Sequence, residues 1–241
     1  MKKLNFAVAA LMAFATTAAS ASVILHGTRI VYPSNSKDVT IVAENNGQQP
    51  ALVQAWLDNG SDPANLDKDE VPFVLTPPIF RLNQDKTQSI RIIYNKAPLP
   101  KDRESLFWLN VLEVPPSLAE ATDQNALRVT FRTRIKMFFR PVEIKAEARK
   151  AASETEWSLT PVGNAVQMMV KNPTPFYVTF TKATATVNGK DYPVTGQMVA
   201  PFSHVELPVE GLTSTQGLSK VTYSFIDDLG ATIQEQAKIA K

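Results

Sequence analysis

Short runs of β-branched and aromatic residues, separated by turn residues, recur through almost all of this sequence. No stretch keeps the 3.6-residue spacing of apolar side chains over the ten or more residues that identify a helix, whereas the runs have the length and composition of strands. Many short strands at this spacing are typical of antiparallel sandwiches. The clearest predicted strands are 40–43, 51–57, 89–94, 105–114, 127–139, 166–170, 176–180, 204–207 and 221–226.

The pattern of strands is interrupted near the middle of the chain. Residues 142–156 are rich in charge and lack the alternation of a strand, which indicates a linker or the entrance to a second domain. This break predicts one domain over residues 22–142 and another over residues 143–241. Both have about the size of an immunoglobulin-like sandwich.

The first residues indicate export. Lys2 and Lys3 precede an apolar run, and small residues lead to Ala19-Ser20-Ala21, which fits the cleavage rule of a secretory signal peptide. Residues 1–21 are therefore predicted to be removed, so that the mature chain begins at Ser22. No later run has the roughly 20 apolar residues of a membrane-spanning helix, so we expect the mature protein to be released.

Charge and cysteine content narrow the function further. The formal net charge of +2 comes from the two lysines of the leader, so the mature chain is formally neutral. A neutral chain has no general attraction for nucleic acid or a membrane surface. Because there is no Cys, the exported protein must derive its stability from burial and not from disulfides.

The sequence offers little for catalysis or for metal binding. It has no Cys and only two histidines, His26 and His204, and it contains no nucleophile elbow, phosphate-binding glycine loop or H-E-x-x-H motif. Residues 67–70 lack the glycine and distant glutamate of a calcium loop. Asp227 and Asp228 are adjacent on a predicted strand and should point to opposite faces, so we expect a structural role for them. We therefore expect neither an enzyme nor a cofactor or metal site.

One predicted strand is unusually long and amphipathic. From residue 127 to 140 the odd positions read Leu, Val, Phe, Thr, Ile, Met, Phe, and the even positions read Arg, Thr, Arg, Arg, Lys, Phe, Arg. Fourteen residues extend about 46 Å at roughly 3.3 Å each, far beyond a typical strand. Its apolar side could face its own core. At a sheet edge, the same strand would instead be available to pair with another chain.

The segment LPKDRESLFWLNVLEVPP at 99–116 is the most specific of several motifs that together resemble a known family, the periplasmic pilus-assembly chaperones of the PapD-like type. The resemblance covers almost the whole mature chain. Further matching segments are TRIVYP at 28–33, LVQAWLDN at 52–59, TPPIFRL at 76–82, RIKMFFRP at 134–141, NPTPFYVT at 172–179 and IDDLG at 226–230.

The resemblance implies two immunoglobulin-like domains in an angled, boomerang-like arrangement, with a cleft that receives the C-terminus of a pilus subunit. The matching cleft cations are Arg29 and Lys136, which suit a carboxylate because charged donors make strong hydrogen bonds to it. On an ideal strand, however, Lys136 lies on the face opposite to Val129 and Phe131.

The resemblance also implies that the last strand of the first domain is lent to an incomplete subunit. Leu127, Val129 and Phe131 match the donor positions. The short connection at 117–125 indicates the short-loop branch of the family. A polar set that fixes the angle between the domains is matched by Arg91, Glu104, Arg140 and Asp228.

The expected function is therefore that of a periplasmic chaperone that binds and caps pilus subunits and delivers them to an outer-membrane usher. A pilus subunit or adhesin is the nearest alternative, but such a chain would ordinarily be one incomplete sandwich, often with a Cys pair. A hydrolase of sandwich fold is the third alternative, and the absence of catalytic motifs disfavours it.

Overall fold

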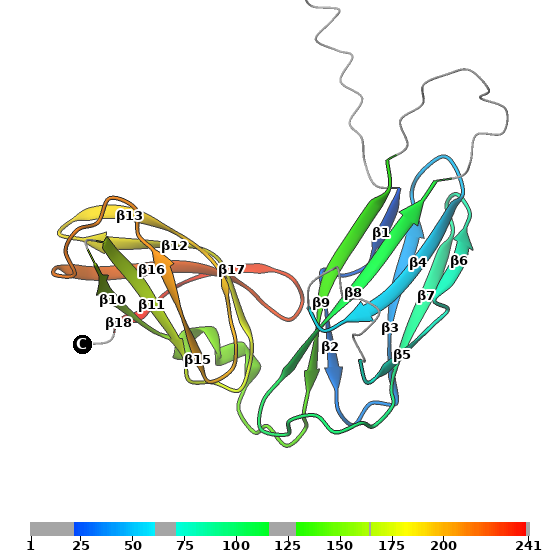
Figure 1. The fold of residues 1–241 in the computed structure, drawn as a ribbon, viewed down its shortest axis with the longest axis horizontal. Helices are drawn as coiled ribbons and strands as arrows, with labels where there is room; N and C mark the ends of the chain where they lie inside the picture. Colours follow the sequence, from blue (N-terminus) through cyan, green and yellow to red (C-terminus); the bar gives the residue numbers. More distant parts are fainter. Residues whose placement is uncertain (1–21, 61–70, 116–128, 164, 240–241) are drawn as a thin grey trace, which may run out of the picture.

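The computed structural model describes residues 22–60, 71–115, 129–163 and 165–239. Two β-sandwiches, one from each half of the chain, lie at an angle and meet at an elbow (Figure 1). This arrangement confirms the predicted fold class. The proposed leader and Leu127 lie outside the described residues.

The first sandwich contains a four-stranded and a five-stranded sheet. The smaller sheet has the order β1 (Val23–Leu25), β3 (Asp38–Asn45), β7 (Thr87–Tyr94) and β5 (Phe73–Thr76). The larger has the order β2 (Arg29–Pro33), β9 (Phe131–Arg140), β8 (Ser105–Val114), β4 (Ala51–Asp58) and β6 (Ile79–Leu82). Side chains alternate along each strand, and the inward set, including Tyr32, Ile90, Leu109 and Met137, forms the core between the sheets.

The second sandwich has its own core and its own two sheets. One sheet has the order β15 (Ser203–Pro208), β11 (Ala165–Asn172), β10 (Glu156–Val162) and β18 (Lys238–Ile239). The other has the order β13 (Lys190–Thr195), β12 (Val178–Val187), β16 (Leu218–Ile226) and β17 (Thr232–Gln236), with β14 (Met198–Val199) also paired to β12. At the centre, Trp157 stacks on Tyr223 with a centroid separation of 5.3 Å and meets Phe180 edge-on at 4.9 Å.

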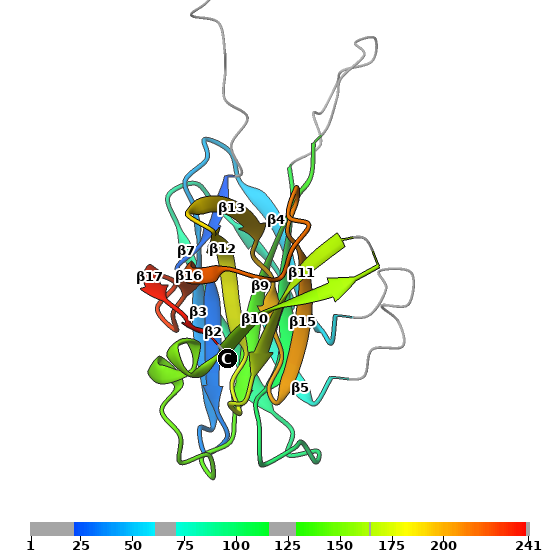
Figure 2. The ribbon, with the colours of Figure 1, turned by 90° about the vertical axis from the view of Figure 1, so that its left-hand side faces the viewer.

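The segment expected to be a linker belongs in part to the second core. It contains two 3-10 turns, η2 (Ala148–Lys150) and η3 (Ala152–Glu154), and in the side view they form a coil beside the second sandwich (Figure 2). Ala151 and Ala152 are buried against the second core, so the segment fixes where that sandwich begins.

The long amphipathic strand differs from its prediction at its start. β9 begins at Phe131 and not at residue 127, and it pairs with β8 from Phe131 opposite Glu113 to Phe139 opposite Ser105. Its other side is paired with β2 only from Lys136 onward. Among the described residues, positions 131–135 of β9 therefore have a neighbour on one side only, so this half of the strand is a sheet edge.

Within the described part of the chain, no helix has the length and apolar character needed to span a membrane.

Candidate functional site

A row of four side chains crosses the outer face of the larger sheet of the first domain. Arg29 of β2 is directly opposite Lys136 of β9, Lys136 is opposite Trp108 of β8, and Trp108 is opposite Asp58 of β4. The parallel register of β2 and β9 thus brings together two cations that are far apart in sequence. Because β2 begins at Arg29, this pair lies where the free edge of β9 starts.

Both cations also reach the second domain. Arg29 donates from Nη1 to the carbonyl oxygen of Ile226 at 2.9 Å, and Lys136 donates from Nζ to Oγ1 of Thr179 at 3.1 Å. Thr179 and Ile226 are themselves cross-strand partners on β12 and β16. A cavity of about 290 Å³ lies beside this contact, with walls from both domains that include Phe138, Phe176 and Phe225.

The two cations are held in a poorly hydrated place. Burial, and to a lesser degree the charge of Arg29, lower the pKa of Lys136 to about 8. Burial also lowers the pKa of Arg29, although Asp228, Asp227 and Glu104 act in the opposite direction. Arg29 Nε is buried, and no described residue accepts a hydrogen bond from it. An added carboxylate would relieve the repulsion between the cations and use their free donors.

The last residue of this row, Asp58, is a buried acid with two side-chain hydrogen-bond donors. Asp58 is only 2% exposed, and it accepts hydrogen bonds from Arg134 Nη2 at 2.5 Å and from Asn110 Nδ2 at 2.6 Å. Arg134 lies over the Trp108 ring at 4.5 Å, and Lys136 lies over the same ring at 5.6 Å. Both cations thus contact one ring, and Trp108 lies between Asp58 and Lys136 in the row across the sheet.

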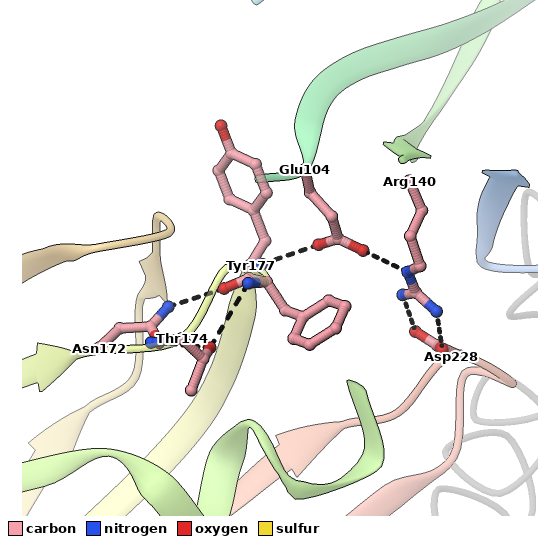
Figure 3. Close-up of polar contacts among 7 residues, drawn as sticks. Glu104, Arg140, Asn172, Thr174, Tyr177 and Asp228 are labelled. Carbon is pink, nitrogen blue, oxygen red and sulfur yellow. Dashed lines mark hydrogen bonds and ion pairs between the residues drawn. The ribbon is translucent and has the colours of Figure 1, made fainter. Parts of the chain in front are cut away.

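A second polar cluster fixes the two domains to each other (Figure 3). Arg140, at the end of β9, binds Asp228 of the second domain with two hydrogen bonds of 2.8 and 3.0 Å, and donates from Nε to Glu104 at 2.7 Å. Glu104 also accepts from the backbone N–H of Tyr177 at 2.8 Å, and its own N–H donates to the carbonyl of Pro175 at 2.9 Å. The hinge therefore combines an ion pair network with direct backbone contacts.

A polar turn presents the Tyr177 amide to the hinge. Asn172 Oδ1 accepts from both the N–H and the hydroxyl of Thr174, at 3.0 and 2.7 Å, and its amide nitrogen donates to the carbonyl of Phe176 at 2.7 Å. The fully buried asparagine thus takes the place of backbone pairing in a segment interrupted by prolines.

A tight hairpin tip presents the carboxylate of Asp228. Asp227 Oδ1 accepts from the N–H of Ala231 at 2.8 Å, which closes the turn. Gly230 has a φ of +86° and approaches Thr28 so closely that a Cβ would lie 2.3 Å from its hydroxyl oxygen. The structural role predicted for Asp227 and Asp228 is consistent with these contacts.

Burial acts on both Glu104 and Arg140, but it decides the direction of the pKa shift only for the acid. Burial raises the pKa of Glu104, although Arg140 and the Tyr177 amide oppose this. For Arg140, burial acts to lower the pKa, but its bonds to Asp228 and Glu104 outweigh burial and raise it. The network thus keeps Arg140 charged although its partner Glu104 is almost completely shielded from solvent.

Arg91 does not belong to this network, so that part of the predicted polar set is wrong. It lies on β7 in the smaller sheet of the first domain, where its Nη2 binds Asp38 Oδ2 at 2.6 Å. The two strands β3 and β7 pair in a register that brings these residues to one exposed face. An arginine on that sheet faces away from the second domain.

The predicted donor side chains are only partly described. Val129 precedes β9 and is 49% exposed, and Phe131, its first residue, is half-buried. Leu127 lies outside the described residues. Lys136 is on the opposite face of β9 from Phe131, as the alternation predicted, because Phe131 faces the core side and Lys136 the outer face.

The sequence did not indicate several partners of the cleft cations. Thr179 lies within a segment that matches the family, but nothing in the sequence marks it as a partner of Lys136. The partner of Arg29 is the backbone carbonyl of Ile226, which cannot be identified from side-chain types. The Asp58–Asn110–Arg134 cluster did leave a signal, since polar residues interrupt otherwise apolar strands. Among the described residues, no cluster of His, Asp and Glu could hold a metal ion.

Two family models match the chain in succession. Residues 22–145 match the N-terminal domain of PapD, described as a pili and flagellar-assembly chaperone, and residues 150–237 match the C-terminal domain of the pili-assembly chaperone PapD. The protein belongs to the PapD family of pili-assembly chaperones.

Individual relatives of this PapD-family chain cover nearly its full length. It is 39% identical over 231 residues to the probable fimbrial chaperone YadV of Escherichia coli K12, covering 95% of this chain and 94% of the relative. It is 41% identical to the chaperone protein FimB/FhaD of Bordetella pertussis, covering 96% and 94%.

Solved structures agree with the fold of the chain. The crystal structure of the YadV chaperone has a TM-score of 0.77 at 40% identity and covers 90% of this chain and 99% of that one. The SafB chaperone of Salmonella enterica, solved in complex with SafA pilin, has a TM-score of 0.71 at 28% identity, covering 89% and 96%.

Removing Glu104 should weaken the connection between the domains. Glu104→Ala leaves the Tyr177 N–H without its acceptor and Arg140 with one acid, so we expect a loss of about 2–4 kcal/mol in the free energy of unfolding. Glu104→Gln keeps an acceptor oxygen and should lose less. Urea unfolding and small-angle scattering measure the stability and the angle. Exposed Glu143→Ala is the control, and unchanged stability and scattering in Glu104→Ala would contradict the expectation.

The buried charge of Lys136 should destabilise the free protein at neutral pH. Its pKa of about 8 in the folded chain lies below the ordinary 10.5, so the unfolded chain binds more protons between these values and stability rises with pH across that window. Lys136→Met should therefore raise the free energy of unfolding at pH 7 by about 1 kcal/mol after allowance for solvent screening.

The gain from Lys136→Met should shrink as the pH approaches 10. Urea unfolding at a series of pH values measures it, with exposed Lys182→Met as the matched control. A destabilised Lys136→Met protein at pH 7 would show that the bond to Thr179 outweighs the burial of the charge.

Proposed function

We propose that this protein is a periplasmic chaperone that binds folding pilus subunits, completes them with a strand of its own and delivers them to an outer-membrane usher. The observation that carries the proposal is the register of β2 and β9, in which the cation pair Arg29 and Lys136 lies where the free edge of β9 begins. Strand pairing and carboxylate binding therefore occur at adjacent places on one strand.

This geometry also gives the direction of the incoming strand. A segment that pairs with residues 131–135 of β9 and ends with its carboxylate at Lys136 must run in the same direction as β9. It would continue the line of β2, which is also parallel to β9. The backbone groups of the edge supply affinity, and the alternating side chains of the donor strand supply specificity.

The donor role of Leu127, Val129 and Phe131 is part of the same proposal. The exposure of Val129 supports it, because an apolar side chain beside a free strand edge gains about 1.5–3 kcal/mol when a partner buries it. The SafB chaperone, a relative of this family, has been solved with a bound pilin, which supports pilus subunits as the partner class.

The family and the leader predicted for the first 21 residues support a proposal for the setting of the protein. The family is described as one of pili-assembly chaperones, and a relative is named a probable fimbrial chaperone. We propose that residues 1–21 direct secretion into the periplasm, that the mature chain is divided into 22–142 and 143–241, and that no cofactor takes part. Hinge residues Glu104, Arg140 and Asp228 would hold the cleft open at a fixed angle.

A free C-terminal carboxylate should be required for binding. A peptide with the C-terminal sequence of a pilus subunit should bind at least about 30-fold more tightly than its amidated form, because a desolvated carboxylate with two charged donors is worth about 2–5 kcal/mol. Lys136→Met should remove this difference, and Lys136→Arg should keep most of it. Titration calorimetry measures the affinities, and equal binding of the two peptides would remove the carboxylate from the proposal.

A charge at a donor position should abolish subunit binding while the fold survives. Val129→Glu places an unpaired carboxylate in the apolar groove of the subunit, which is strongly disfavoured. Thr130→Glu is the matched control, since Thr130 is also exposed and is the next residue along the chain. Co-purification with the pilus subunit from periplasm measures binding. Normal recovery of that subunit by a folded Val129→Glu protein would show that this side chain is not a donor.

A further inference from the structure

A buried carboxylate lies at the end of the first sandwich far from the hinge. Glu113, near the end of β8, is 8% exposed and points to the inner side of its sheet, between Val53 of β4 and Phe131 of β9. Its Oε2 accepts from the backbone nitrogens of Ser22 at 3.1 Å and of Val23 at 3.0 Å, and its Oε1 accepts from the Ser22 hydroxyl. Two of these donors belong to Ser22, immediately before β1, and the third to Val23, the first residue of β1, which belongs to the opposite sheet.

Glu113 differs from the other buried acids among the described residues. Asp58 is paired with Arg134, and Glu104 is paired with Arg140. Glu113 has no Lys, Arg or His within ion-pair distance in the described part of the chain. A buried carboxylate that accepts only from neutral donors is stabilised further by a cation, so the geometry around Glu113 favours a positively charged donor.

We propose that Glu113 is a receptor for the α-ammonium group of Ser22, which forms when the leader is removed. A leader peptidase uses water to hydrolyse the Ala21–Ser22 bond; the carboxylate stays on Ala21, and the released amine of Ser22 takes up a proton. The nitrogen that becomes charged is the one already 3.1 Å from Glu113, so processing creates the ion pair without moving β1.

The surroundings of Ser22 form a fitted socket. The N–H of Asn46 donates to the carbonyl of Ser22 at 2.8 Å, and a Cβ on Gly47 would lie 2.3 Å from the Cβ of Ser22. The backbone of Gly47 can approach this closely only because it carries no side chain. A cavity of about 290 Å³ adjoins the site, and Gln48 and Gln49 are among the polar residues that line it. It leaves room for water at the remaining ammonium protons.

No other titratable side chain competes for the site within the described ranges. The strands beside Glu113 present Val53 and Phe131, and the cavity walls contain no further acid or base among the described residues. On the elements packed around it, Glu44 of β3 is paired with His26, and Arg132 of β9 is exposed on the opposite face from Phe131.

The ion pair makes stability depend on pH in a defined direction. The acid should raise the pKa of the α-ammonium above its ordinary range of about 7.7–8.0. The stabilisation is then complete below that range and is lost as the pH rises through the raised value. A chain that still carries a residue or a blocking group on the Ser22 nitrogen gains none of it.

The α-amino pKa of the processed protein tests the proposal. Mass spectrometry first establishes that the protein from periplasm begins at Ser22, and an NMR titration then follows the labelled Ser22 α-carbon. We expect a pKa at least about one unit above the ordinary range, and a return to that range in Glu113→Gln but not in the control Glu44→Gln. An ordinary value in the unmodified protein, or a chain that begins elsewhere, would overturn the proposal.

A second measurement applies if Glu113→Gln does not fold. Protein acetylated at the Ser22 nitrogen keeps the amide donor of the precursor but has no charge. At pH 7 its unfolding midpoint should lie about 3 °C below that of the free-amine protein, with the gap closing at high pH. Equal midpoints at pH 7 would contradict the ion pair, whatever the protein binds in its cleft.

Discussion

The guanidinium of Arg140 connects the two domains, and the geometry of the cleft depends on it. It binds Asp228 with two parallel hydrogen bonds and Glu104 with a third, so the network is broken if the domains separate. Arg140 is on the same strand as Lys136, and Asp228 follows the strand that ends at Ile226. Fixing the ends of these two strands therefore also fixes how far the cleft cations lie from the second domain.

Periodicity predicted much of the fold because most strands have one buried face. β8 has the predicted bounds, and the amphipathic pattern of β9 was also recognised. Alternation alone did not show that Val129 and Thr130 precede the strand. The charged segment at 142–156 contains two buried alanines, Ala151 and Ala152, that were not predicted. A single buried turn is too short to show a repeating spacing of apolar residues. Local pattern indicates which face is buried but not which core it joins.

The site was less accessible to sequence because it depends on register and on backbone groups. Arg91 was placed in the wrong network because the sequence does not show which of the two sheets contains its strand. Only the pairing of β3 with β7 brings Arg91 to Asp38. The cation pair Arg29 and Lys136 was indicated by family resemblance alone. Its contact with a carbonyl of the second domain follows from the angle at the hinge, which no local pattern encodes.

In the proposed function, the two cations would make the C-terminal end of a subunit a better ligand than any other anion. Lys136 and Arg29 are partly buried and repel each other, so keeping both charged in the free protein costs free energy of desolvation and repulsion. A small carboxylate from solution would reduce the repulsion but cannot pair with the edge of β9, whereas an internal strand can pair but brings no charge. Only a strand that ends at the cations does both, and the position of its carboxylate then sets the register of every side chain along the edge. Lys136 must be protonated for this purpose, and a carboxylate beside it would raise its pKa. Binding above about pH 8 should therefore take up a proton.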